Sequence, residues 1–266
     1  MRISRIIVTA ACLAISACAT QRADDSALNS PVSPTTGEEK QERARARIHT
    51  ELAASYYDLG NMGVALEEVK EALGADPTYG PAYNVAALIY ARLKEDRLAE
   101  QSFQRALSIN PSDYDTLNNY GSFLCDRKQV PKAIKHFLAA VRNPLYPFPD
   151  RSYVNAGVCA RRGGDLAGAE EYFQAALKTS PAQPQALYQM ADLYYARGDY
   201  AGAKGYLGRL TQVSQVGPEA LWLGVRLERR LGDRNSEASY ALQLRNKFPN
   251  SRESRALNAG QYGQYE

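Results

Sequence analysis

Small and aromatic residues recur at helical spacing through residues 80–113. The first half carries Tyr83, Ala86 and Tyr90, whose spacings of three, four and seven residues place them on one face of a helix. The second half carries a small-large-small set at the same kind of spacing: Ala99, Phe103 and Ala106. Charged residues separate the halves, and Pro111 ends the second because proline cannot continue a helix. The stretch therefore predicts two short amphipathic helices joined by a turn.

This layout recurs with a period of about 34 residues, which resembles the tetratricopeptide repeat. A proline ends the second helix at Pro77, Pro111, Pro181 and Pro249. The small residue recurs at Ala65, Ala99, Ala133, Ala169 and Ala203. The large residue four positions later is Val69, Phe103, Phe137, Phe173 or Leu207. We therefore predict an all-α fold, a right-handed superhelix of six helix-turn-helix repeats within residues 37–255, followed by a tail of residues 256–266. The expected repeats are 46–79, 80–113, 114–149, 150–183, 184–217 and 218–251.

Two repeats depart from the pattern. Residues 143–149 contain three prolines, lengthen the third repeat by two residues and exclude a regular helix there. This insertion is either a neutral loop, a local change in the superhelical path, or a contact site with exposed Tyr146 and Phe148. The sixth repeat has Glu237 and Ala241 where alanine and phenylalanine are expected. Terminal repeats are often atypical because one side faces solvent.

Residues 1–17 have the layout of a bacterial export signal, with two arginines before an apolar stretch that is too short to span a membrane. Residues 15–18 (ISAC) resemble a lipobox, in which the signal is cleaved before the cysteine and Cys18 is lipidated. The alternative is an ordinary secretory signal with an incidental cysteine. We favour the lipoprotein interpretation because the cysteine lies where the motif requires it.

The residues after the lipobox indicate where the protein is anchored. Ala19 follows the lipidated cysteine in place of aspartate. By resemblance to sorted bacterial lipoproteins, this indicates the periplasmic face of the outer membrane. Two or three acyl chains give stable anchoring, whereas one alone is marginal. Residues 18–36 are polar, contain two prolines and lack periodicity, so we expect a flexible tether.

Charge and composition reduce the number of functions that this chain is expected to have. A net charge of +3 gives no reason to expect a nucleic-acid partner. The two histidines, His49 and His136, lie far apart, and neither a nucleophile elbow nor a phosphate-binding loop occurs. The repeats leave no room for a catalytic domain. We therefore expect no enzyme activity, no catalytic residues, no metal site and no cofactor, and a monomer in isolation.

Two cysteines remain in the repeat region. Cys125 and Cys159 fall in the first helices of the third and fourth repeats. First helices of neighbouring repeats pack side by side, so the two thiols could meet, and an oxidising periplasm favours a disulfide. The alternative is two separate small buried residues. We favour the disulfide because the export signal sets the compartment.

The concave face of such a superhelix is lined by first helices. Repeat positions two, five, nine, twelve and thirteen are expected to point into it. In this chain those positions include Tyr57, Asn84, Leu88, Arg92, Asn118, Ser122, Tyr188, Asp192, Tyr195, Trp222, Arg226, Arg229 and Arg230. A groove with amide donors and aromatic walls suits an extended or helical peptide.

Several segments are more specific than a generic repeat: 117–125, 145–147, 155–159, 223–227 and 238–244. Together with a lipobox and six repeats, they are similar to the type IV pilus biogenesis/stability lipoproteins of the PilF/PilW family. The resemblance implies a pilotin, which helps the type IV pilus secretin reach the outer membrane and multimerise there. The alternative is a general adaptor lipoprotein in outer-membrane protein assembly or envelope maintenance.

Overall fold

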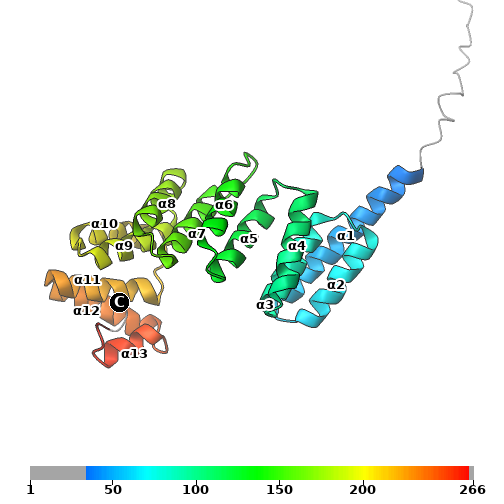
Figure 1. Cartoon of the computed structure of the whole chain (residues 1–266). Helices are drawn as coiled ribbons and strands as arrows, with labels where there is room; N and C mark the ends of the chain where they lie inside the picture. Colours follow the sequence, from blue (N-terminus) through cyan, green and yellow to red (C-terminus); the bar gives the residue numbers. More distant parts are fainter. Residues whose placement is uncertain (1–33, 264–266) are drawn as a thin grey trace, which may run out of the picture. The chain divides into compact units, whose positions relative to one another are not determined.

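The computed structural model describes residues 34–263, which form thirteen α-helices and, within that range, no strand (Figure 1). The helices are α1 (Pro34–Asp58), α2 (Met62–Ala75), α3 (Gly80–Arg92), α4 (Asp96–Ile109), α5 (Tyr114–Asp126), α6 (Val130–Val141), α7 (Pro149–Arg162), α8 (Leu166–Thr179), α9 (Pro184–Arg197), α10 (Tyr200–Val213), α11 (Pro218–Leu231), α12 (Arg234–Lys247) and α13 (Arg252–Asn258). From Glu42 onward the helices belong to one compact unit. None of these described helices is both long enough and apolar enough to cross a membrane.

The helices pack as consecutive pairs. Helix α3 packs on α4, α5 on α6, α7 on α8, α9 on α10 and α11 on α12. Each first helix also packs on the first helix of the next repeat, so that α3, α5, α7, α9 and α11 form one row (Figure 1). The predicted all-α tetratricopeptide superhelix is confirmed.

Glycine and aspartate shape the turn inside the later repeats. The glycines adopt the left-handed backbone region that suits a residue without Cβ: φ is +87° at Gly164, +85° at Gly198 and +77° at Gly232. An aspartate follows each of them and caps the next helix; the carboxylate of Asp199 accepts a hydrogen bond from the backbone N–H of Gly202 at 2.8 Å. At the corresponding turns of earlier repeats, Lys94 and Lys128 adopt positive φ instead.

Buried phenylalanines fill the space between paired helices. Phe137 and Phe173 are 1% and 0% exposed. Each ring lies directly on a glycine of the first helix: a Cβ added at Gly121 would lie 2.7 Å from the ring of Phe137, and one added at Gly157 would lie 2.5 Å from that of Phe173. The ring and the glycine therefore form a matched pair, because only glycine leaves room for so close an approach.

The sixth repeat supplies its ring from a different position. Ala241 stands where phenylalanine is expected, and it is buried. The neighbouring residue Tyr240 takes over, and its ring covers Gly224, where an added Cβ would lie 2.8 Å away. The atypical sequence of this repeat thus keeps the aromatic-on-glycine contact but shifts it by one residue.

The proline-containing segment 143–149 is anchored by one of its two aromatic residues. Tyr146 is 8% exposed, and its ring stacks on that of Tyr114 with centroids 4.8 Å apart. The hydroxyl groups of Tyr146 and Ser152 are hydrogen-bonded to each other at 3.2 Å. Phe148 is half exposed. The alternative of a contact site with both aromatic residues exposed therefore does not hold for Tyr146, because stacking on Tyr114 of α5 buries it.

Helices are present on both sides of the limits that were predicted for the repeats. Helix α1 begins at Pro34, inside the stretch expected to be a tether, because proline is well tolerated in the first turn of a helix. At the other end, α13 enters the predicted tail, with Ala256 and Leu257 buried against α11 and α12. The Ser251 hydroxyl caps this helix. The predicted signal, Cys18 and most of the tether lie outside the described residues.

A disulfide joins Cys125 of α5 to Cys159 of α7, with the two Cα atoms 5.7 Å apart. Both residues are buried in the hydrophobic cluster formed around Phe103 and Phe137. Of the two alternatives for these cysteines, the structure has the bonded one. The bond connects first helices of adjacent repeats, on either side of segment 143–149.

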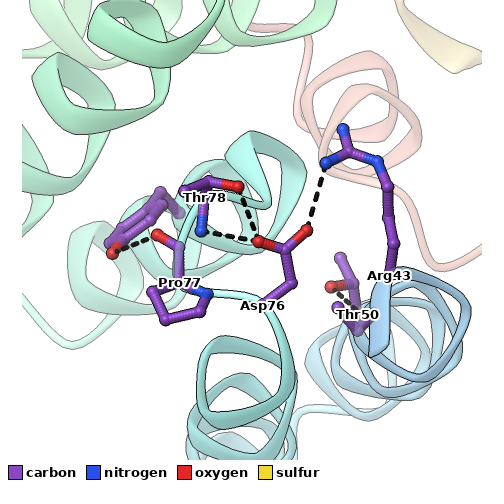
Figure 2. Close-up of polar contacts among 7 residues, drawn as sticks. Arg43, Thr50, Asp76, Pro77 and Thr78 are labelled. Carbon is purple, nitrogen blue, oxygen red and sulfur yellow. Dashed lines mark hydrogen bonds and ion pairs between the residues drawn. The ribbon is translucent and has the colours of Figure 1, made fainter. Parts of the chain in front are cut away.

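Asp76 holds the junction between the first two repeats (Figure 2). Its carboxylate accepts hydrogen bonds from the backbone N–H and the hydroxyl of Thr78, at 2.8 and 2.6 Å, and from Arg43 Nη1 at 3.1 Å. Burial acts to raise the pKa of Asp76, but the hydrogen bonds from Thr78 and the charge of Arg43 outweigh it and lower the pKa. One repeat later, the neutral amide of Asn110 accepts from the N–H and hydroxyl of Ser112 in the same way.

The charge of Asp76 predicts a loss of stability in acid. A carboxylate whose folded pKa is depressed contributes stability above its unfolded pKa of about 3.9, and this contribution is lost as pH falls through the lower folded pKa. We expect Asp76→Asn to cost about 1 kcal/mol at pH 7 and progressively less as pH falls below 4. Urea unfolding at several pH values measures this. Asn110→Ala is the control, because its cost should not change with pH; a constant cost for Asp76→Asn would contradict the prediction.

Candidate peptide-binding face

Most of the predicted groove residues line hollows along the row of first helices, here called the first-helix face. The hollow nearest the N-terminal end is lined by Tyr57, Leu88, Arg92 and Ser122, from α1, α3 and α5. The guanidinium carbon of Arg92 lies 5.2 Å from the centroid of the Tyr57 ring, a cation–π contact. Four of the predicted residues of the first three repeats thus line one hollow, which presents an aromatic ring, an aliphatic side chain, a guanidinium group and a hydroxyl.

Asparagine amides connect neighbouring first helices. The amide oxygen of Asn84 in α3 accepts a hydrogen bond from Nδ2 of Asn119 in α5 at 3.2 Å. The amide oxygen of Asn118 accepts from Ser152 Oγ at 2.9 Å and from Asn155 Nδ2 at 3.0 Å, both in α7. Asn118 and Asn155 also line a hollow. These amides therefore hold the face together as well as forming part of its surface.

A third hollow is formed where α9, α10 and the start of α11 meet. Tyr188 lines it together with Pro184 and Val216. Burial raises the pKa of Tyr188 to about 12, and the carboxylates of Asp192 and Glu219 add to the increase. The phenol therefore stays neutral throughout the physiological range and can donate a hydrogen bond to a bound peptide.

The C-terminal part of the face holds a cluster of arginines around one carboxylate. Arg161 Nη2 donates to Asp192 Oδ2 at 2.6 Å, and Arg226 Nη2 lies 3.8 Å from the other carboxylate oxygen. The guanidinium of Arg226 lies 4.9 Å from the ring centroid of Tyr195. These residues and Arg230 line a hollow of about 380 Å³, here called the arginine hollow. It brings together four of the predicted residues: Asp192, Tyr195, Arg226 and Arg230.

Two predicted residues near the end of the chain behave differently from the rest. Trp222 is 2% exposed, and its ring stacks on that of Tyr262 with centroids 5.6 Å apart. The prediction that Trp222 lines the groove is therefore wrong, because α13 and the residues after it cover this side of α11. Arg229 remains exposed; it is paired with Glu237 at 3.1 Å, and its guanidinium lies 4.0 Å from the Tyr262 ring centroid.

The structure adds residues to the face that the sequence analysis missed. Arg161 occupies position twelve of the fourth repeat, so the rule used for the other positions already pointed to it. Asn119 occupies position six, which the rule does not include; its hydrogen bond to Asn84 and its place in the lining of the N-terminal hollow put it on the face. The face is therefore wider than a single set of repeat positions.

The chemistry of the face is that of a binding surface. It presents amides, phenols and guanidinium groups, which are the side chains that recognise peptide main chain and polar side chains. Within residues 34–263, no group of three or more His, Cys, Asp or Glu side chains is placed to hold a metal ion.

Comparisons with known proteins agree with this architecture. Tetratricopeptide-repeat models match residues 50–114 and 124–184, 160–222, and 102–135. The chain is 29% identical over 211 residues to the type IV pilus assembly protein PilF of Pseudomonas aeruginosa, covering 79% of this chain and 84% of that protein.

Two solved structures extend the match to nearly the whole of each relative. The structure of Pseudomonas aeruginosa PilF superposes with a TM-score of 0.72 at 30% identity, covering 83% of this chain and 99% of the relative. The crystal structure of PilW, described as a widely conserved type IV pilus biogenesis factor, superposes with a TM-score of 0.70 at 31% identity, covering 80% and 97%. The chain therefore belongs to the PilF/PilW family of type IV pilus tetratricopeptide-repeat proteins.

Proposed function

We propose that this protein is a pilotin, a lipid-anchored protein of the outer membrane that binds the type IV pilus secretin through its first-helix face. Binding would bring secretin subunits to the periplasmic face of the outer membrane and promote their multimerisation there. The partner and the anchor are the two parts of this proposal, and each has its own support.

The row of hollows on the first-helix face is the main observation that supports a protein segment as the binding partner. It extends from Tyr57 in α1 to Arg230 in α11 and consists of hydrogen-bonding, aromatic and cationic side chains. Tetratricopeptide repeats are protein-interaction scaffolds, and this family serves type IV pilus biogenesis. A protein segment of the pilus machinery is therefore the occupant that fits best, and the secretin is the component that a pilotin binds.

The resemblance of residues 15–18 to a lipobox supports the second part of the proposal, a lipid anchor on Cys18. Acylation of Cys18 would fix the protein to the membrane, and the polar residues that follow would let the repeats reach a partner. Attachment of a binding module to a surface raises the effective concentration of that module for partners at the same surface. The lipid would therefore contribute to secretin assembly without contacting the secretin.

The proposal is tested by measuring the amount and membrane location of the secretin multimer in cells that lack this gene. We expect the secretin multimer to be lost in the deletion strain and restored by the wild-type chain. With Cys18→Ala, we expect secretin to be misplaced from the outer membrane, because the repeats fold but are not anchored. Membranes are separated by density, and the multimer is followed on mild-detergent gels.

Cys12→Ala is the matched control, since it removes a cysteine from the part of the signal that is cleaved away. It should leave multimer amount and location unchanged. If the deletion and Cys18→Ala also leave both unchanged, the pilotin proposal is wrong, and a general adaptor lipoprotein becomes the better description.

A further inference from the structure

We propose that the arginine hollow binds a carboxylate side chain, so that the segment docking on the C-terminal repeats carries an aspartate or glutamate at this point. This inference deepens the proposed function, on which it rests, because it states the chemistry of the segment that the first-helix face receives. It concerns Arg161, Asp192, Tyr195, Arg226 and Arg230.

Arg226 carries the inference because it is a buried cation with incomplete pairing. The residue is 7% exposed, and its Nε is buried without a hydrogen-bond partner among the described residues. The distance of 3.8 Å between Arg226 Nη2 and Asp192 Oδ1 is too long for a hydrogen bond. A buried donor that lacks a partner is costly, and an incoming carboxylate can be bound by the planar guanidinium with two parallel hydrogen bonds.

The single carboxylate of the hollow is already committed to another arginine. Asp192 accepts a hydrogen bond from Arg161 at 2.6 Å, and Arg161 also donates to Gln189 Oε1 at 3.1 Å. The hollow is lined by four arginines, including Arg197, and by one aspartate. Arg197 is paired with Glu170 at 2.6 Å. Asp192 therefore does not neutralise both Arg161 and Arg226, and these three side chains together keep an excess of positive charge.

Aromatic rings hold Arg226 in place for this role. Its guanidinium carbon lies 4.9 Å from the ring centroid of Tyr195 and 5.9 Å from that of Trp222. Cation–π contacts on the faces of the guanidinium leave its edge for in-plane hydrogen bonds. The side chain is thus oriented before a ligand arrives, which reduces the entropy lost on binding.

The first measurement uses blocked hexapeptides that are identical except for one glutamate or glutamine. Full-length mature chain in detergent is titrated with each peptide at low salt and followed by NMR. We expect the glutamate peptide to bind at least about tenfold more tightly than the glutamine peptide and to shift resonances of the arginine hollow. Equal binding of the two peptides overturns the inference.

Two variants change the affinity in opposite directions. Arg226→Gln should reduce the preference for the glutamate peptide by about tenfold. Asp192→Asn should increase affinity for it by about threefold or more, because it removes the competing carboxylate, and a gain of affinity cannot come from damage to the fold. Arg209→Gln is the control: it removes the same charge from α10, where Arg209 stacks on Tyr206 away from the hollow. A loss of affinity with Asp192→Asn, or an equal effect of Arg209→Gln, contradicts the inference.

Binding of purified secretin separates this inference from the proposed function. If the wild-type chain does not bind secretin, the proposed function is wrong, whatever the peptides do. If the wild-type chain binds secretin but Arg226→Gln and Asp192→Asn leave that binding unchanged, the function stands and the carboxylate is not part of the docking segment.

Discussion

Replacing Phe173 with alanine is expected to destabilise the protein by about 3–5 kcal/mol. The ring is fully buried and packs with Ala160, Ala169 and Met190. Its other face lies on Gly157, which has no side chain with which to fill the space that the ring would leave. Gly157, Ala160 and Ala169 are small residues of α7 and α8, so they leave most of the vacated space unfilled, and Met190 of α9 is the one long side chain among these four neighbours.

Phe148→Ala provides the matched control, because it deletes the same atoms from a residue that is 50% exposed. This change should cost less than about 1 kcal/mol. Denaturant unfolding followed by circular dichroism measures both free energies of unfolding. Similar costs at the two positions would show that the aromatic-on-glycine contact does not dominate the packing of the fourth repeat.

A second variant tests the contact itself. Gly157→Ala alone should destabilise the protein by about 1–3 kcal/mol, because the new Cβ meets the Phe173 ring. In the Phe173→Ala background, the same change should cost much less, because the ring is gone and the methyl group enters the vacated space. The difference between the two costs is the coupling energy of the pair, and additivity of the two substitutions would show that the residues do not act together.

The helices and their buried positions could be predicted from the sequence where they follow from the local spacing of apolar residues. Ala99, Phe103 and Ala106 were selected by spacing alone, and all three are buried. Proline placement marked the ends of second helices for the same reason, since it acts on the adjacent backbone. The backbone conformation of the turns was harder to predict where Lys94 and Lys128 adopt a positive φ that glycine adopts in other repeats. There the packed helices impose the positive φ, and the residue type does not reveal it.

The candidate site could be predicted only for residues whose exposure is set by contacts within their own repeat and the neighbouring repeats. Position rules placed Asp192 and Arg226 on the first-helix face, and the structure brings them to the same hollow. Trp222 follows the same rule but is buried, because it is covered by α13 and by Tyr262, which lies 40 residues further along the chain. The sequence also left the exposure of Tyr146 open, since its partner Tyr114 lies outside the proline-containing segment. Contacts distant in sequence leave no periodic signal.

Loss of the disulfide between Cys125 and Cys159 is expected to destabilise the protein by about 3–4 kcal/mol. The cysteines are separated by 34 residues, and closing a loop of that size removes conformational entropy from the unfolded chain. We expect unfolding free energy to fall by this amount when dithiothreitol is added to the wild-type protein. A variant with Cys125→Ala and Cys159→Ala should be similarly weakened without reductant and should not respond to it.

The position of the disulfide predicts which helices lose local stability when it is reduced. The closed loop contains the whole of segment 143–149, where prolines interrupt the regular packing of the third repeat on the fourth. In a repeat array each unit contacts only its neighbours, so a lost cross-link weakens one interface before it affects the others. Amide hydrogen exchange after reduction should therefore rise first in α5 to α7, while α9 to α12 exchange as before. A uniform rise along the chain would instead mean that the disulfide acts only on the unfolded state, and that the packing of Tyr146 on Tyr114 is sufficient to hold the extended junction.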